Sequence, residues 1–193
     1  MRLFVALDIE EAIRLRIVRF MDGVREFAPD ARWVRPESLH ITLKFIGEQS
    51  PERTEAIKES LGNVKSGYTQ IAFRGCGFFP TAKSARVFWV GIEGDDQLAP
   101  LAEKVETALE SLHLPKDDHA FSPHLTLARG KSAAPGRRPG DGASKKFERL
   151  QQKLAALPVS EFGTMTAREF FLYESKLSPS GSRYTKLQRY SLE

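Results

Sequence analysis

Several features that would place this chain in other protein classes are scarce or missing. The 193 residues include a single cysteine, Cys76, which excludes an internal disulfide and fits a reducing compartment. No apolar run approaches the length of a membrane span, and the apolar start at residues 1–7 runs directly into acidic residues, unlike a signal peptide. We therefore expect a cytoplasmic protein with no membrane segment.

Neither sign of charge dominates. Lysine and arginine total 29 and aspartate and glutamate total 25, so the net charge is only +4. A surplus this small permits a phosphate-bearing ligand without requiring one. Hydrophobic residues make up 41% of the chain, which is ordinary for a globular protein. We expect residues 1–193 to form one bilobal domain, present as a monomer.

Histidine is also scarce, yet two of the four histidines occur in the same short motif. The stretches are His40-Ile41-Thr42-Leu43 and His124-Leu125-Thr126-Leu127. Both lie in alternating apolar runs that are typical of half-buried strands, expected over residues 39–46 and 121–129. Alternation places each histidine on the same face as its threonine. A single His-x-Thr has no meaning by itself, whereas a matched pair indicates a shared site.

The remaining pattern interleaves helices with pairs of adjacent strands. Such pairs favour antiparallel sheets with helices packed on one face, an α+β fold. Residues 130–143 are rich in Gly, Pro and Ala and are expected to form a flexible insertion. Further strands are expected over residues 2–9, 68–79, 86–92, 159–177 and 183–192, and helices over 10–28, from 50, over 95–112 and over 144–157.

An internal repeat links the two motifs. At an offset of 84 residues, the first strand, the following helix and the motif strand align with a second copy of the same order; the matching pairs are Arg2/Arg86, Phe4/Phe88, Ser38/Ser122, His40/His124, Thr42/Thr126 and Leu43/Leu127. We interpret this as a duplication with a pseudo-twofold axis. Such an axis would bring the two His-x-Thr faces together across a groove.

Two imidazoles and two hydroxyls in one groove suit displacement at phosphorus. One histidine can act as general base and the other as general acid, because an unperturbed pKa near 6.5 allows both forms at neutral pH. Thr42 and Thr126 can donate hydrogen bonds to the phosphate oxygens. A strained five-membered cyclic phosphate needs no metal, and neither Cys76 nor a His-x-x-x-His spacing supplies further metal ligands. We expect neither a metal nor another cofactor.

The motif pair resembles the 2H phosphoesterase superfamily. Within it, the chain is similar to the LigT/ThpR-type RNA 2′,3′-cyclic phosphodiesterases, formerly called 2′-5′ RNA ligases. The similarity extends over nearly the whole chain. It is carried by residues 2–7 (RLFVAL), 33–47 (WVRPESLHITLKFIG), 121–129 (FSPHLTLAR) and 172–179 (LYESKLSP).

The resemblance implies a fold and a reaction. The fold is bilobal, with two antiparallel sheets, helices on the outer faces and a central cleft. The reaction hydrolyses the terminal 2′,3′-cyclic phosphodiester of RNA to a 2′-phosphomonoester without a metal, with His124 as proton acceptor and His40 as proton donor. The pseudo-symmetry leaves this assignment of roles open from the sequence alone. Weak reverse 2′-5′ RNA ligation is also implied.

Two alternative functions remain open. The first is a 2H phosphodiesterase acting on 2′-5′ linked oligonucleotides or small cyclic nucleotides. The second is a non-catalytic RNA-binding module whose motifs are vestigial.

Three further residues are candidates for substrate binding. Lys44 falls on the His40 face by alternation, where it can hold the phosphate, although a solvated lysine fits equally well. Arg129 matches the arginine that ends the family's second motif, but alternation points it away from His124, so a bulge or strand end must redirect it. Phe45 and Trp33 could stack a base, although core packing is the commoner use of such aromatics.

Overall fold

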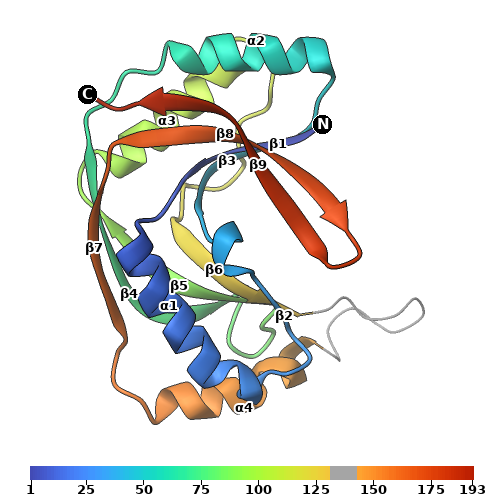
Figure 1. The fold of residues 1–193 in the computed structure, drawn as a ribbon, viewed down its shortest axis with the longest axis vertical. Helices are drawn as coiled ribbons and strands as arrows, with labels where there is room; N and C mark the ends of the chain where they lie inside the picture. The colour runs from blue at the N-terminus through green and yellow to red at the C-terminus, as the bar shows by residue number, and fades with distance from the viewer. Residues whose placement is uncertain (131–142) are drawn as a thin grey trace.

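Two antiparallel sheets form the framework of the protein (Figure 1). The computed structural model describes residues 1–130 and 143–193, so nearly all of the expected insertion lies outside the described residues. Sheet A has the order β3-β1-β8-β9 and sheet B the order β2-β6-β5-β4-β7. The strands are β1 (Arg2–Leu7), β2 (Arg32–Trp33), β3 (Ile41–Glu48), β4 (Thr69–Phe79), β5 (Val87–Gly94), β6 (His124–Arg129), β7 (Glu161–Ala167), β8 (Glu169–Ser178) and β9 (Gly181–Ser191).

Four α-helices and two short 3₁₀ helices complete the described fold. They are α1 (Glu11–Val24), η1 (Arg25–Phe27), η2 (Pro36–Ser38), α2 (Pro51–Gly62), α3 (Leu98–Glu110) and α4 (Ala143–Ala155). Helix α2 begins where the sequence predicted, because the Ser50 hydroxyl accepts a hydrogen bond from the Arg53 backbone N–H at 3.2 Å and Pro51 occupies the first turn. Within the described ranges, no helix combines the length and apolarity needed to cross a membrane.

The helices lie on the outer faces of the sheets, and two of them exchange sides. Helix α1 follows a strand of sheet A but packs on sheet B, where Phe20 contacts Phe88 of β5 and Phe162 of β7. Helix α3 follows a strand of sheet B but lies behind sheet A, where Glu106 pairs with Lys44 of β3. This arrangement confirms the predicted α+β class with two antiparallel sheets.

The two expected copies have corresponding strand pairings. Strand β1 pairs antiparallel with β3 in sheet A, and β5 pairs antiparallel with β6 in sheet B. The registers differ by one residue, because Ala6 pairs with Thr42 whereas Trp89, rather than Val90, pairs with Thr126. The duplication itself stays a prediction from the sequence.

Each motif strand contains a β-bulge immediately after its His-x-Thr. In β3, Thr42 pairs with Ala6 and Lys44 with Val5, so Leu43 has no partner on β1. The corresponding bulge in β6 leaves Leu127 without a partner on β5. A bulge inserts one residue and thereby reverses the faces of the residues that follow. These two bulges decide which side chains accompany the histidines.

Candidate active site

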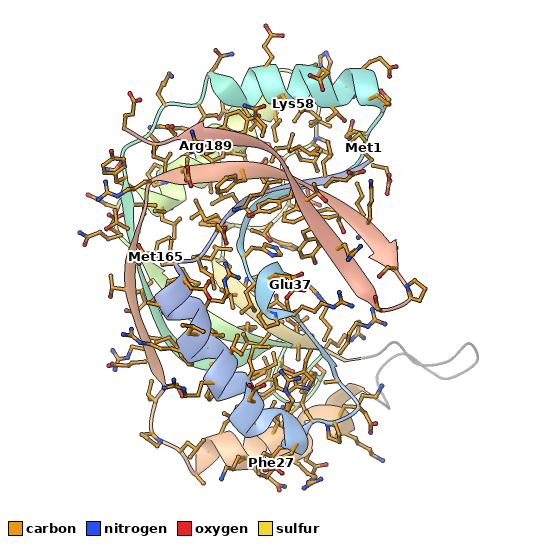
Figure 2. The ribbon with its side chains drawn as sticks, viewed as in Figure 1. Met1, Phe27, Glu37, Lys58, Met165 and Arg189 are labelled. Atoms are coloured by element: carbon orange, nitrogen blue, oxygen red, sulfur yellow. The ribbon has the colours of Figure 1, made fainter. Side chains whose placement is uncertain are left out.

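His40 is held by the backbone that leads into β3. It lies one residue before the strand and just after η2, whose Glu37 is marked near the middle of the molecule in Figure 2. The His40 Nδ1 is 2.7 Å from the Ser38 carbonyl oxygen. Because a carbonyl can only accept, Nδ1 carries the proton and donates it. The other ring nitrogen, Nε2, lies 3.0 Å from Thr42 Oγ1 and is available for proton transfer.

His124 is anchored in the same way. It opens β6, and its Nδ1 donates to the Ser122 carbonyl oxygen at 2.9 Å. The acceptor is again the carbonyl two residues upstream, so Nε2 is again the nitrogen left for chemistry. Thr126 lies two residues further on, before the bulge, and therefore shares the His124 face.

His40 and His124 are close enough for the charge of one to act on the other. Strand β3, which begins directly after His40, and strand β6, which begins at His124, are in contact near the centre of the molecule (Figure 1). The pKa of His40 lies below its usual 6.5, chiefly because burial disfavours the imidazolium. The positive charges of Arg129 and His124 lower this pKa further, while the Ser38 hydrogen bond and the Asp8 carboxylate act in the opposite direction. Arg129 and His124 are thus within electrostatic reach of His40.

Aromatic side chains surround His40 on the sheet A side. Its ring centroid lies 4.8 Å from that of Phe4, 5.2 Å from that of Tyr184 and 6.3 Å from that of Tyr173. Phe4 and both tyrosines form an apolar cluster separate from the main core. This cluster shields one side of the imidazole from water, which accounts for the burial that lowers its pKa.

A second aromatic pair lies beside His124 in sheet B. The Phe79 ring contacts the His124 ring edge-on at 4.9 Å and packs on Trp89 at 5.1 Å. Trp89 lies across its strand neighbour Gly77, where an added Cβ would sit only 2.2 Å from the indole ring. Any other residue at position 77 would displace Trp89 and disturb the support of His124.

Lys44 does not lie on the His40 face, and this expectation from alternation was wrong. The bulge at Leu43 turns Lys44 to the opposite side of sheet A, where its side chain is only 3% exposed. Its Nζ contacts Glu106 Oε1 at 2.9 Å, Asp117 Oδ1 at 3.0 Å and the Pro115 carbonyl oxygen at 2.8 Å. Lys44 is thus a buried ion-pair partner behind the sheet and does not face the site.

The same kind of bulge, one of the two causes predicted from the sequence, turns Arg129 to the His124 face. Beyond Leu127, Arg129 pairs with Val87, which shares its face of β5 with Trp89 and hence with Thr126. Its charge also acts on His40. The predicted redirection of Arg129 is therefore confirmed.

Phe45 occupies the position in β3 that Arg129 occupies in β6. It pairs with Phe4, which contacts His40, so Phe45 lies on the site face with its side chain 49% exposed. The Arg2 guanidinium lies 5.1 Å from its ring centroid. Trp33, the other candidate for base stacking, packs edge-on against Phe88 and donates its Nε1–H to the Ala28 carbonyl oxygen at 3.0 Å, so it belongs to the core.

Six further residues lie near the histidines without having been predicted from the sequence: Phe4, Tyr173, Tyr184, Phe79, Arg32 and Arg35. Phe4 had a signal, because alternation in β1 separates it from the buried Leu3 and Val5. Tyr184 had none, since only the pairing of β9 with β8 brings it to His40. In the described part of the chain, no group of three or more histidine, cysteine, aspartate or glutamate side chains is arranged to hold a metal ion.

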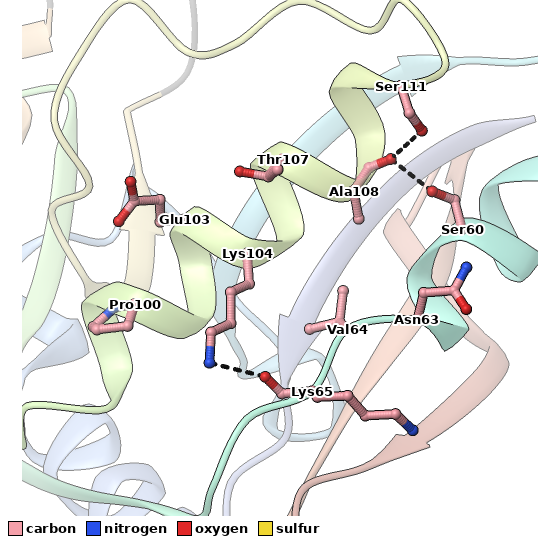
Figure 3. A pocket seen from close by; sticks show the side chains of 10 residues that line it. All are labelled: Ser60, Asn63, Val64, Lys65, Pro100, Glu103, Lys104, Thr107, Ala108 and Ser111. Carbon is pink, nitrogen blue, oxygen red and sulfur yellow. Dashed lines mark hydrogen bonds between the residues drawn. The ribbon is translucent and has the colours of Figure 1, made fainter.

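Two features lie away from the histidines and lack the groups for acid–base or nucleophilic chemistry: a pocket between α2 and α3, and the Cys76 thiol. A pocket of about 600 Å³ lies between α2 and α3, and its ten lining residues, which include Lys65, Glu103 and Lys104, contain no histidine (Figure 3). Burial raises the pKa of the Cys76 thiol to about 12, so the thiol stays protonated and is a poor nucleophile at neutral pH.

The sequence and the fold both match proteins of known family. A protein of Archaeoglobus fulgidus named RNA 2′,3′-cyclic phosphodiesterase is 35% identical over 191 residues, which cover 97% of this chain and 98% of that protein. A Thermus thermophilus protein of the same name is 32% identical and covers all of this chain and 90% of its own.

Solved structures with a similar fold support the same family. The crystal structure of TT0787 of Thermus thermophilus has a TM-score of 0.78 at 30% identity and covers 99% of this chain and 97% of its own. Escherichia coli LigT, crystallised with 3′-AMP, has a TM-score of 0.75 at 27% identity with the same coverage. The family model described as LigT like phosphoesterase matches residues 7–89 and again residues 90–184. This chain is a member of the LigT-like phosphoesterase family.

Proposed function

We propose that this protein hydrolyses the terminal 2′,3′-cyclic phosphodiester of RNA to a 2′-phosphomonoester. The observation that carries the proposal is the pair of histidines, each with Nδ1 bonded to a carbonyl two residues upstream and within electrostatic reach of each other. The curated relatives named RNA 2′,3′-cyclic phosphodiesterase support the choice of substrate. The 3′-AMP complex of Escherichia coli LigT supports nucleotide binding by this fold.

The proposed chemistry is an in-line displacement at phosphorus. His124 Nε2 accepts a proton from water as the water oxygen attacks the phosphorus. The bond from phosphorus to O3′ breaks, and His40 gives its Nε2 proton to the departing O3′. The phosphate stays on O2′, and the products are a 2′-phosphate and a 3′-hydroxyl. Thr42, Thr126 and Arg129 stabilise the charge on the non-bridging oxygens.

The lowered pKa of His40 has a consequence for its role as donor. In the free enzyme at neutral pH, His40 is largely neutral and holds only the Nδ1 proton. An anion in contact with an imidazolium stabilises the charged form. The bound cyclic phosphate therefore favours uptake of a proton from solvent at His40 Nε2, so the donor becomes protonated when substrate binds.

Two other properties follow from the same site. Run in reverse, the chemistry joins a 2′,3′-cyclic end to a 5′-hydroxyl, which gives weak 2′-5′ ligation. Both motifs come from one chain and complete the site within it, so we propose a monomer. The alternative in which the protein acts on 2′-5′ linked oligonucleotides or small cyclic nucleotides requires the same residues, and only the choice of substrate separates it from our proposal.

The direct test is turnover of an RNA oligonucleotide with a 2′,3′-cyclic end in the presence of excess chelator. We expect hydrolysis at an undiminished rate, with the product matching a 2′-phosphate standard and not a 3′-phosphate standard in ³¹P NMR. Turnover restricted to 2′-5′ linked oligonucleotides would support the alternative phosphodiesterase. Binding without turnover would support a non-catalytic RNA-binding module, and loss of activity with chelator would contradict the two-histidine scheme.

The pH dependence of kcat/KM is expected to be bell-shaped, with its acidic midpoint below pH 6.5. The group with the lower pKa sets the acidic limb, and His40 titrates below 6.5 in the free enzyme. The Asp8 carboxylate raises the His40 pKa, so Asp8→Asn should move the acidic limb further toward low pH. Asp22→Asn on α1 serves as the control, because Asp22 pairs with Arg25 at the surface and does not act on His40. An acidic limb that moves to higher pH in Asp8→Asn would contradict this assignment.

A further inference from the structure

A small basic pocket adjoins the proposed active site. It has a volume of about 120 Å³ and lies where the β8–β9 turn approaches β2, η2 and the end of β6. We call it the arginine pocket; its lining includes Arg32, Arg35, Arg129, Ser38, Ser182 and Tyr184. The Arg35 Nη2 donates to the Ser180 carbonyl oxygen at 2.8 Å, which links the two sides of the pocket.

Within residues 1–130 and 143–193, no carboxylate neutralises the positive charge of the arginine pocket. Arg32 and Arg129 are direct cross-strand partners in the β2–β6 pair, an arrangement of like charges that is destabilising by itself. Among the described residues, no carboxylate lies within ion-pair distance of Arg32, Arg35 or Arg129. Uncompensated guanidinium groups around a concave space are suited to bind an anion with oxygen acceptors.

The pocket and the histidines share residues. Ser38 lines the pocket, and its carbonyl oxygen accepts the His40 Nδ1–H at 2.7 Å. Tyr184 also lines it, and its ring centroid is 5.2 Å from that of His40. Two residues that line the pocket therefore also contact the His40 side chain. At about 30 Å³ per water, it has room for about four waters, which suits a phosphate group but not a nucleoside.

An RNA end offers one group that is anionic, small enough for the arginine pocket and close to the cyclic phosphate. When the cyclic phosphate lies between His40 and His124, the nearest other anion of the same chain is the phosphodiester that joins the last two nucleotides. We propose that the arginine pocket binds this phosphodiester. The inference rests on the proposed function and narrows it, because it assigns the enzyme to polynucleotide ends in preference to cyclic mononucleotides.

The test compares two substrates that differ by one nucleotide. Cytidine 2′,3′-cyclic phosphate has no upstream phosphodiester, whereas the dinucleotide CpC with a 2′,3′-cyclic end has one. In Arg32→Ala and in Arg35→Ala, we expect the ratio of kcat/KM on the dinucleotide to kcat/KM on the mononucleotide to fall about 10- to 100-fold, the usual effect of losing a hydrogen bond to a charged group. Arg19→Ala, an exposed arginine on α1 outside the pocket, should leave the ratio unchanged.

The second part of the test uses a dinucleotide substrate whose backbone carries no charge. Replacing the phosphodiester of the dinucleotide by a methylphosphonate should lower kcat/KM of the wild type by a similar factor. It should have little effect on Arg32→Ala, because the two changes remove the same interaction. An unchanged ratio in both arginine variants, or an equal methylphosphonate effect in variant and wild type, would overturn the subsite while leaving hydrolysis of the mononucleotide intact. If the wild type hydrolyses neither substrate, the proposed function itself fails.

Discussion

Replacing either histidine by alanine is expected to lower kcat on a 2′,3′-cyclic RNA end by about 10²- to 10⁴-fold, the usual contribution of one positioned acid or base. His40→Ala and His124→Ala each remove one of the two proton transfers in a concerted step. The double variant should therefore lose far less than the product of the two single effects, because the second proton transfer has little value once the first is gone. Single-turnover rates with saturating enzyme measure the loss at the chemical step.

The matched control is His119→Ala, which removes an exposed histidine outside the site. It should retain the wild-type rate. Circular dichroism and thermal unfolding should show that both site variants are folded, since neither ring belongs to the main core. A site variant that is folded and keeps most of its rate would refute the paired acid–base scheme.

Lys44→Ala should destabilise the protein by about 2–3 kcal/mol, because it leaves Glu106 half-buried without its cation. The value falls below the range for fully buried pairs because Asp117, the other carboxylate, is largely exposed. The free energy of unfolding in urea measures this loss. At a temperature where the variant is folded, kcat/KM on a cyclic RNA end should stay within about threefold of wild type, because Lys44 lies behind sheet A.

Lys58→Ala is the comparison for stability. Lys58 pairs with Glu55 one turn earlier on the surface of α2, and its loss should cost less than about 0.5 kcal/mol. The alternative from strand alternation, in which Lys44 holds the phosphate, predicts the reverse pattern. It requires a loss of more than about 10-fold in kcat/KM with little change in stability.

Lys44 and Arg129 show where strand alternation succeeds and where it fails. Alternation correctly grouped His40 with Thr42 and His124 with Thr126, because both pairs precede the bulges. Beyond the bulged residues Leu43 and Leu127, alternation fails in both strands. For Arg129 the family resemblance required a bulge or a strand end, and the structure contains a bulge at Leu127. For Lys44 no such requirement was available, since Leu43 itself gives no local signal of a bulge.

Residues that reach the site through pairing of distant strands could not be predicted from the sequence. Arg32, Arg35 and Tyr184 approach the site only because β2 pairs with β6 and β9 pairs with β8. No local pattern marks these contacts, since each depends on how strands distant in the chain assemble. The start of α2 and the two-sheet class were predictable because the Ser50 cap and hydrophobic periodicity are local signals. The helix expected from residue 95 instead begins at Leu98, where no side chain caps it.

The crossed placement of α1 and α3 couples the stability of sheet A to that of sheet B. Each sheet obtains part of its outer cover from a helix that follows a strand of the opposite sheet. A rigid-body movement of one sheet away from the other would expose apolar surface that these helices now bury. The hydrophobic contacts that hold the two sheets together therefore also hold β3 and β6, and with them His40 and His124, in place relative to one another.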